Sequence, residues 1–95
     1  MIGAYIIHSI KLNRFYIGST TDINQRLINH NNHHHGKNTF TAKANDWTIF
    51  LFIPTPNYPQ ANRIELLIKK KKSAIFIQNL KKYPELIKKL LVDSM

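Results

Sequence analysis

Among the five carboxylates of this chain, Glu65 has the position best suited to chemistry. It lies within an expected helix, between Ile64 and Leu66, beside the apolar stripe. One carboxylate is enough for Mg²⁺, which keeps several waters and binds one or two carboxylates together with substrate phosphate. Sites with two metal ions usually need more carboxylates than this. The spacing also fits an ordinary surface ion pair with Lys69 at i+4, and spacing alone favours that second interpretation.

The other four carboxylates have structural explanations. Asp22 precedes an expected helix and is suited to cap it. Glu85 follows Pro84 in a helix's first turn, where the helix dipole favours negative charge. Asp46 lies in a loop before an expected strand, and Asp93 lies near the end of the chain.

Arg26 and His30 stand four residues apart on the first expected helix, so they share one of its faces. They flank the apolar stripe of Ile23 and Leu27 and could reach back over the edge of the sheet. Arginine can bind a phosphate through two hydrogen bonds, and histidine can transfer a proton near neutral pH. A solvated arginine and a polar histidine near a helix end would give the same pattern, and the spacing alone favours that.

Two tyrosines, Tyr5 and Tyr16, lie on the first two expected strands and could point to the same face if the register allows. A tyrosine hydroxyl can act as a general base when a metal or cations lower its pKa. The commoner case is a half-buried sheet tyrosine. Gly18, two residues after Tyr16, would let a backbone or a phosphate come close.

The charge balance predicts a polyanionic partner. Fourteen Lys and Arg against five Asp and Glu give a formal net charge of +9, which favours DNA or RNA over an anionic membrane surface. The run from Lys69 to Lys72 wraps around most of a helix and attracts phosphate without regard to sequence, as does Lys43. His33, His34 and His35 are adjacent and point in different directions, so they are interpreted as a polar loop and not as a metal site.

Composition excludes several classes of protein. The absence of cysteine removes disulfides, thiolate metal sites and a cysteine nucleophile. No apolar run approaches the roughly 20 residues that a membrane span needs, and the N-terminus has no signal-peptide pattern. The expectation is a single domain over residues 1–95, located in the cytoplasm and without a membrane partner. Its core would cover about residues 2–80, followed by a helical extension over about 81–95.

The elements that must position these residues follow from local patterns. Strands are predicted over residues 4–9, 15–19 and 47–53. A helix is predicted over about 23–31, and a second helix from about Pro59 through the lysine run. A last helical stretch starts near Ser73, is interrupted at Pro84 and continues to about Val92. The resulting order, β-β-α-β-α-α, indicates the α+β class, with a small three-stranded antiparallel sheet flanked by helices.

Taken in order, these landmarks resemble the GIY-YIG nuclease family. Gly3-Ala4-Tyr5, followed after ten residues by Tyr16-Ile17-Gly18, resembles its paired tripeptides. The Arg-x-x-x-His spacing of Arg26 and His30 matches the helix that follows in the family. The strand after Trp47 matches the next element, and Ala61, Glu65 and Lys69 match the helix that carries the family's metal ligand. The similarity covers roughly residues 2–80 and is greatest to the small stand-alone branch.

This chain departs from the family pattern at three points. Ala4 stands where isoleucine is usual, and Ser19 stands where some members have a lysine. Many members use an asparagine after the metal-binding glutamate, and Asn79 is the candidate at a suitable distance. We expect no counterpart of the extra DNA-binding domain that homing members carry, so the resemblance leaves sequence specificity open.

The resemblance implies a metal-dependent endonuclease that hydrolyses phosphodiester bonds in nucleic acid, with DNA as the expected substrate. Glu65 would hold one divalent cation, Mg²⁺ or Mn²⁺, and Arg26 would bind a phosphate oxygen. One of the two tyrosines would take the proton from the attacking water, with the other tyrosine and His30 assisting. The alternative is a nucleic-acid-binding module of the same fold with little or no cleavage. The oligomeric state and the choice between the tyrosines stay open.

Overall fold

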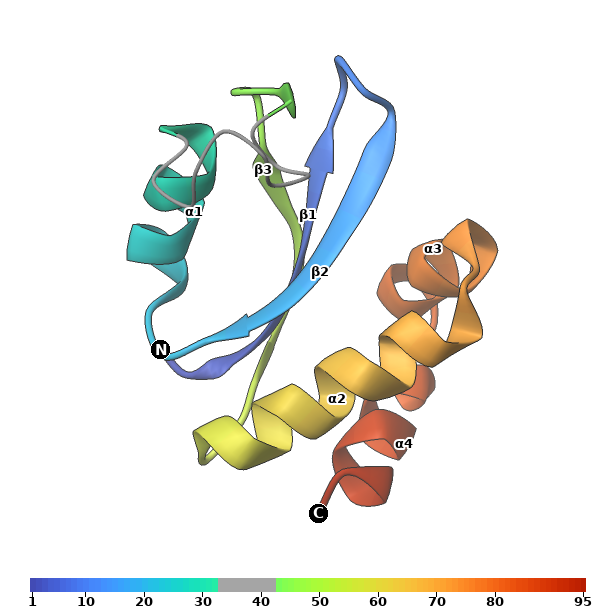
Figure 1. The fold of residues 1–95 in the computed structure, drawn as a ribbon. Helices are drawn as coiled ribbons and strands as arrows, with labels where there is room; N and C mark the ends of the chain where they lie inside the picture. The colour runs from blue at the N-terminus through green and yellow to red at the C-terminus, as the bar shows by residue number, and fades with distance from the viewer. Residues whose placement is uncertain (33–42) are drawn as a thin grey trace.

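Three antiparallel strands form the centre of the fold in the computed structural model, which describes residues 1–32 and 43–95 (Figure 1). Their order in the sheet is β2-β1-β3, so β1 is central and β2 is an edge strand. Asn13 adopts a positive φ of 49° in the turn between the first two strands, a conformation that asparagine tolerates well. The strands are β1 (Gly3–Ser9), β2 (Arg14–Thr20) and β3 (Thr48–Pro54).

Side chains from the preceding loops define where the helices begin. Asp22, Asn57 and Ser73 each accept a hydrogen bond from the backbone N–H three residues later, which satisfies a donor that the helix itself leaves unpaired. Pro84 begins the last helix, where its missing N–H costs nothing. The helices are α1 (Ile23–Asn31), α2 (Tyr58–Lys71), α3 (Ala74–Lys82) and α4 (Pro84–Asp93).

The observed order confirms the predicted α+β class and its three-stranded antiparallel sheet. The strands extend one residue beyond the predicted bounds at several ends, and α1 has the bounds predicted for it. The final helical stretch is two helices, α3 and α4, because Tyr83 is extended (φ −122°, ψ 95°) as residues before proline usually are.

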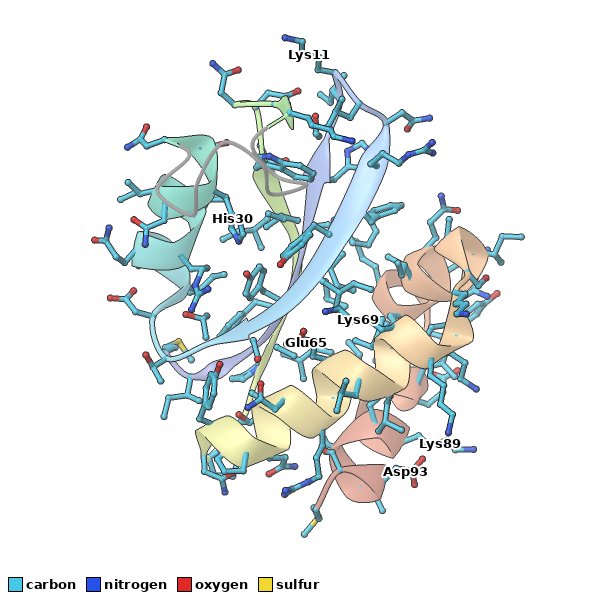
Figure 2. All side chains as sticks on the ribbon, viewed as in Figure 1. Lys11, His30, Glu65, Lys69, Lys89 and Asp93 are labelled. Atoms are coloured by element: carbon cyan, nitrogen blue, oxygen red, sulfur yellow. The ribbon has the colours of Figure 1, made fainter. Side chains whose placement is uncertain are left out.

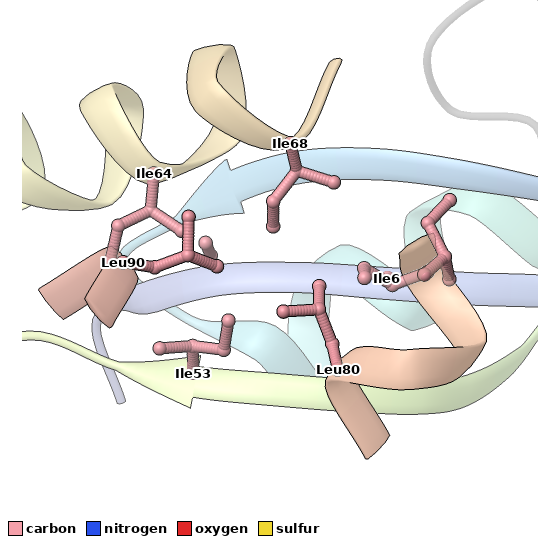
Figure 3. Packing of buried hydrophobic residues seen from close by; sticks show 8 residues of the cluster. Ile6, Ile53, Ile64, Ile68, Leu80 and Leu90 are labelled. Atoms are coloured by element: carbon pink, nitrogen blue, oxygen red, sulfur yellow. The ribbon is translucent and has the colours of Figure 1, made fainter. Parts of the chain in front are cut away.

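Alternation along the strands divides the side chains between two layers of helix, with α1 on one face of the sheet and α2, α3 and α4 on the other (Figure 1). Tyr5 and Ile7 face α1 and pack in one cluster with Trp47. Ala4 and Ile6 face the other way, into the larger cluster. Figure 3 shows that cluster, in which residues of the sheet meet residues of α2, α3 and α4, namely Ile6, Ile53, Ile64, Ile68, Leu80 and Leu90.

The last helix is tied to α2 as well as to the core. The Gln60 side chain donates hydrogen bonds to the Leu91 carbonyl and the Ser94 hydroxyl, and the Arg63 guanidinium donates to the Ser94 carbonyl. Leu90 is 6% exposed and belongs to the cluster on the sheet. Residues 84–94 therefore support α2, the helix that carries Glu65.

Candidate active site

Three rings gather between β1, β2 and α1. Tyr5 pairs with Gly18 across the hairpin, and Tyr16 pairs with Ile7, so both tyrosines point to the face that α1 covers. The ring centroids of Tyr5 and Tyr16 are 6.5 Å apart. His30, from the last turn of α1, lies 5.8 Å from the Tyr5 ring and 5.1 Å from the Tyr16 ring. The register thus brings both predicted tyrosines and the predicted histidine together.

The Tyr5 hydroxyl is held in place by His30. The two side chains are 2% exposed each, and Tyr5 Oη lies 2.7 Å from His30 Nε2. A neutral imidazole with its proton on Nδ1 can accept the phenol proton at Nε2. Burial raises the pKa of Tyr5 well above its ordinary value, and Tyr16 adds to the rise. Tyr5 is therefore a protonated phenol at neutral pH, with a hydrogen-bond acceptor already in position.

Arg26 is one helical turn before His30 and half-buried on the same face of α1. It lowers the pKa of Tyr5, whereas Glu65 raises it, so both charges lie within electrostatic reach of the Tyr5 hydroxyl. Because Arg26 comes from α1 and Glu65 comes from α2, the two charges approach Tyr5 from opposite layers. Figure 2 shows His30 on the α1 side and Glu65 between α2 and β2.

A polar cluster surrounds the Glu65 carboxylate where α2 passes the edge strand. The Ser19 hydroxyl donates to Glu65 Oε1 over 2.7 Å and also lies against the Asn62 side-chain amide. A hydroxyl has one hydrogen to donate, so an Asn62 amide that turns its NH₂ group toward Ser19 satisfies all three side chains. Lys69 Nζ lies 2.6 Å from Glu65 Oε2. The ion pair predicted from spacing is therefore present, and Glu65 also belongs to a polar network.

Residues of two helices and the edge strand thus converge around the Tyr5 hydroxyl and the Glu65 carboxylate. A family model described as the GIY-YIG catalytic domain matches residues 1–82, which is most of the 95-residue chain. The chain belongs to the GIY-YIG family. No curated protein and no solved structure matched it.

The two glycines of the GIY-YIG tripeptides both lie where a side chain would meet the neighbouring strand. A Cβ on Gly18 would lie 2.5 Å from Cζ of Tyr5, and a Cβ on Gly3 would lie 2.7 Å from Cζ of Phe52. Gly18 therefore leaves room for the Tyr5 ring, whereas Gly3 leaves room first for the Ile53 backbone carbonyl and then for the Phe52 ring. At Gly18, the close approach expected of a backbone or a phosphate is made by the Tyr5 ring, and a nucleic-acid contact at Gly18 stays a prediction.

The donors around Glu65 fit the hard divalent cation that GIY-YIG nucleases use. The Glu65 side chain is 18% exposed, the Ser19 hydroxyl bonds to it, and the Asn62 amide lies against that hydroxyl. Carboxylate, hydroxyl and amide oxygens suit Mg²⁺ and Mn²⁺. Over residues 1–32 and 43–95, no three His, Cys, Asp or Glu side chains gather around a common point. The site therefore matches an ion that takes the rest of its ligands from water and phosphate.

The predicted lysine run is divided by the end of α2. Lys69 and Lys72 line a groove beside β2. Lys70 lines another pocket together with Asp93 of α4, and Lys71 lies over the Phe76 ring at 5.4 Å. The four lysines therefore belong to different surfaces.

Two further predicted residues lie apart from the rings. Lys43 is exposed ahead of β3, the strand at the opposite edge of the sheet from β2. Asn79 belongs to α3, in the layer away from His30, and its carbonyl accepts the Tyr83 N–H. Roles for Lys43 and Asn79 stay predictions. The histidines at 33–35 lie outside the described residues.

Sequence reasoning missed Asn62 and Tyr58 and recorded Ser19 only as a departure from the family. Asn62 lies three residues before Glu65 and Tyr58 lies seven before it, so helical spacing alone could have placed both on the face of Glu65. Tyr58 also raises the pKa of Tyr5, which puts it within reach of the site. Ser19 needed the tertiary structure, because its partner is 46 residues away.

Within the described part of the chain, no helix combines the length and the apolar composition that crossing a bilayer requires.

Proposed function

We propose that this chain is a metal-dependent endonuclease that hydrolyses phosphodiester bonds in DNA by a one-metal mechanism. The observation that carries the proposal is the Tyr5–His30 hydrogen bond of 2.7 Å, formed at the edge strand within electrostatic reach of Glu65. A buried phenol bonded to an imidazole, with a carboxylate within electrostatic reach, supports proton transfer at a metal-assisted site. Membership of a nuclease family supports the same conclusion.

Glu65 would hold the cation, with Ser19 and Asn62 fixing the orientation of its carboxylate through the network around Ser19 Oγ. When bound, Mg²⁺ or Mn²⁺ supplies stabilisation of the charge that develops on the scissile phosphate and on the leaving oxygen. Lys69 neutralises the carboxylate in the absence of the ion, and its long side chain can move to solvent or to a neighbouring phosphate.

Proton transfer from the attacking water needs an acceptor. A neutral tyrosine can accept a proton only if it releases its own, and Tyr5 has His30 Nε2 in position to receive it. We therefore assign Tyr5 and His30 as a relay. The water oxygen bonds to phosphorus, its proton passes to Tyr5, the Tyr5 proton passes to His30, and the bond to the leaving oxygen breaks. The raised pKa of Tyr5 is compatible with this concerted transfer, because no free tyrosinate is required.

Tyr16 and Arg26 are the remaining residues with a role in the proposed reaction. Tyr16 is half-buried beside His30 and would orient the water. Arg26 would bind a non-bridging phosphate oxygen through two hydrogen bonds, a geometry that the planar guanidinium favours.

The proposal is tested by nicking of supercoiled plasmid with Mg²⁺, Mn²⁺ or EDTA. Wild type should nick with either metal and not with EDTA, and Glu65→Gln should lose at least about a hundredfold in rate, as expected for removal of a main electrostatic group. Glu85→Gln is the matched control, since Glu85 lies in the first turn of α4, and it should nick like wild type. Nicking that persists in Glu65→Gln would contradict the assignment.

One observation favours a second candidate, a binding module without cleavage. Lys69 Nζ, 2.6 Å from Glu65 Oε2, already neutralises the carboxylate, as in a purely structural ion pair. That candidate predicts salt-sensitive DNA binding that neither EDTA nor Glu65→Gln alters, together with no nicking by wild type in any metal.

A further inference from the structure

An open groove lies between the edge strand and the corner where α2 ends and α3 begins. Its volume is about 430 Å³. Residues of β2 form one wall, and residues from Ile68 to Gln78 form the other. The groove begins within one helical turn of Glu65, since Lys69 lines it.

The groove is cationic. Arg14, Lys69 and Lys72 line it, and none of the described residues that line it is acidic. Arg14 and Lys72 are exposed, so their charges are available to a ligand from solvent. Lys69 adds a third charge when it leaves Glu65. A row of like charges along one groove matches a chain of phosphates better than a single small anion.

The backbone at the end of α2 aims Lys72 into this groove. Lys72 adopts the left-handed conformation (φ 49°, ψ 41°), and its N–H donates to the Lys69 carbonyl. This ending separates Lys72 from Lys70, which lines a pocket beside α4, and from Lys71, which lies over Phe76. The lysine run therefore contributes two of its four charges to the groove.

The charged residues of the groove lie within a few nucleotides of the candidate active site, and apolar side chains lie between them. Arg14 lies four residues along β2 from Gly18, or about 13 Å. Lys72, directly after α2, lies seven residues from Glu65, or about 10 Å along the helix axis. These spans equal the axial rise of about three or four nucleotides on one strand. The apolar side chains of Phe15, Ile17 and Ile77 line the groove between the charges.

We propose that this groove binds the backbone phosphates of the DNA strand adjacent to the cleaved bond, with Arg14, Lys69 and Lys72 as the contacts. The inference rests on the proposed function for its choice of DNA as the partner. It adds a direction to the site, because the strand would leave Glu65 along β2 toward Arg14.

The test is the affinity of the whole chain for a short fluorescein-labelled DNA duplex, measured by anisotropy in EDTA over a series of salt concentrations. The groove variant is Arg14→Gln with Lys72→Asn, because asparagine tolerates the left-handed conformation of Lys72. The matched control is Lys88→Gln with Lys89→Gln, which removes the same charge from the exposed surface of α4. Melting temperatures of both variants establish that they are folded.

The groove variant should weaken binding and lower the slope of log affinity against log salt by about two, at roughly 0.9 for each lost phosphate contact. The control should change the slope by much less. Equal losses in the two variants would overturn the proposal, since net charge alone would then explain binding. Because binding is measured in EDTA, it is tested separately from cleavage. A chain that binds DNA through the groove in EDTA but does not nick plasmid with Mg²⁺ or Mn²⁺ would support the groove and refute the proposed nuclease activity.

Discussion

Replacing Gly18 with Ala distinguishes the structural role of this glycine from a role in binding nucleic acid. The Ala methyl group would lie 2.5 Å from Cζ and 2.8 Å from Cε1 of Tyr5, whereas carbon atoms pack best at about 3.5–4.0 Å. The Tyr5 ring would have to move by about 1 Å. Tyr5 has little room to move, since it is 2% exposed and bonded to His30 over 2.7 Å.

The expected cost follows from these contacts. Overpacking a buried site costs about 1–3 kcal/mol, and the strained Tyr5–His30 hydrogen bond adds about 0.5–1.5 kcal/mol. The loss of glycine's freedom in the unfolded chain offsets about 0.4–1 kcal/mol. We therefore expect Gly18→Ala to lower the free energy of unfolding by about 1–4 kcal/mol. A loss of about 2 kcal/mol corresponds to roughly 8–16 °C in melting temperature for a chain of this size.

Urea unfolding of four proteins measures the effect: wild type, Gly18→Ala, Tyr5→Leu and the double variant. Without the phenol ring, the methyl group has space, so Gly18→Ala should cost less than about 0.5 kcal/mol in the Tyr5→Leu background. Plasmid nicking should fall in Gly18→Ala, because the ring that moves carries the Tyr5 hydroxyl.

Two results would refute this reasoning. A cost that is equal in both backgrounds would mean that the Tyr5 ring is not what the methyl group meets. An unchanged stability with selectively weaker DNA binding would return Gly18 to the role of a phosphate contact, as the sequence suggested.

Three further predictions concern the ion pair, the buried phenol and the last helix. Lys69→Met removes the ammonium group that lies 2.6 Å from Glu65 and competes with a metal ion for the carboxylate. Since such a pair is worth about 0.5–1 kcal/mol, calorimetry without DNA should show that Mn²⁺ binds the variant roughly two- to fivefold more tightly than wild type. An unchanged Mn²⁺ affinity would show that Lys69 does not compete with the metal ion. Wild type should lose stability as the pH rises above about 10, because burial raises the Tyr5 pKa and the unfolded chain releases that proton first. Urea unfolding should show that Tyr5→Phe loses less stability than wild type over the same pH range. If the free energy of unfolding falls equally with pH in both proteins, Tyr5 is not the cause. Leu90→Ala should lower the free energy of unfolding by about 2–5 kcal/mol, since Leu90 is 6% exposed and belongs to the larger core cluster. The control Val92→Ala, at a residue that is 66% exposed, should change the free energy of unfolding by no more than about 0.5 kcal/mol. If Leu90→Ala has an equally small effect, α4 does not contribute to the stability of the core.

Local rules predicted much of this fold. Local patterns predicted all three strands, and each observed strand end lies within one residue of its predicted bound. Helical spacing paired Glu65 with Lys69 four residues on. Asp22 caps α1 as its type and position indicated. These features depend on residues within a few positions of one another, and backbone periodicity determines them before any packing occurs.

The sequence by itself therefore determined the three strands, the first two helices and their order and, through the family resemblance, the candidate residues. The tertiary structure decided what each candidate meets. It placed Ser19 against Glu65, 46 residues away, and Tyr5 against His30, 25 residues away. It also put the Tyr5 ring over Gly18. Such contacts depend on strand register and on how helices pack across a sheet, which no short stretch of sequence encodes.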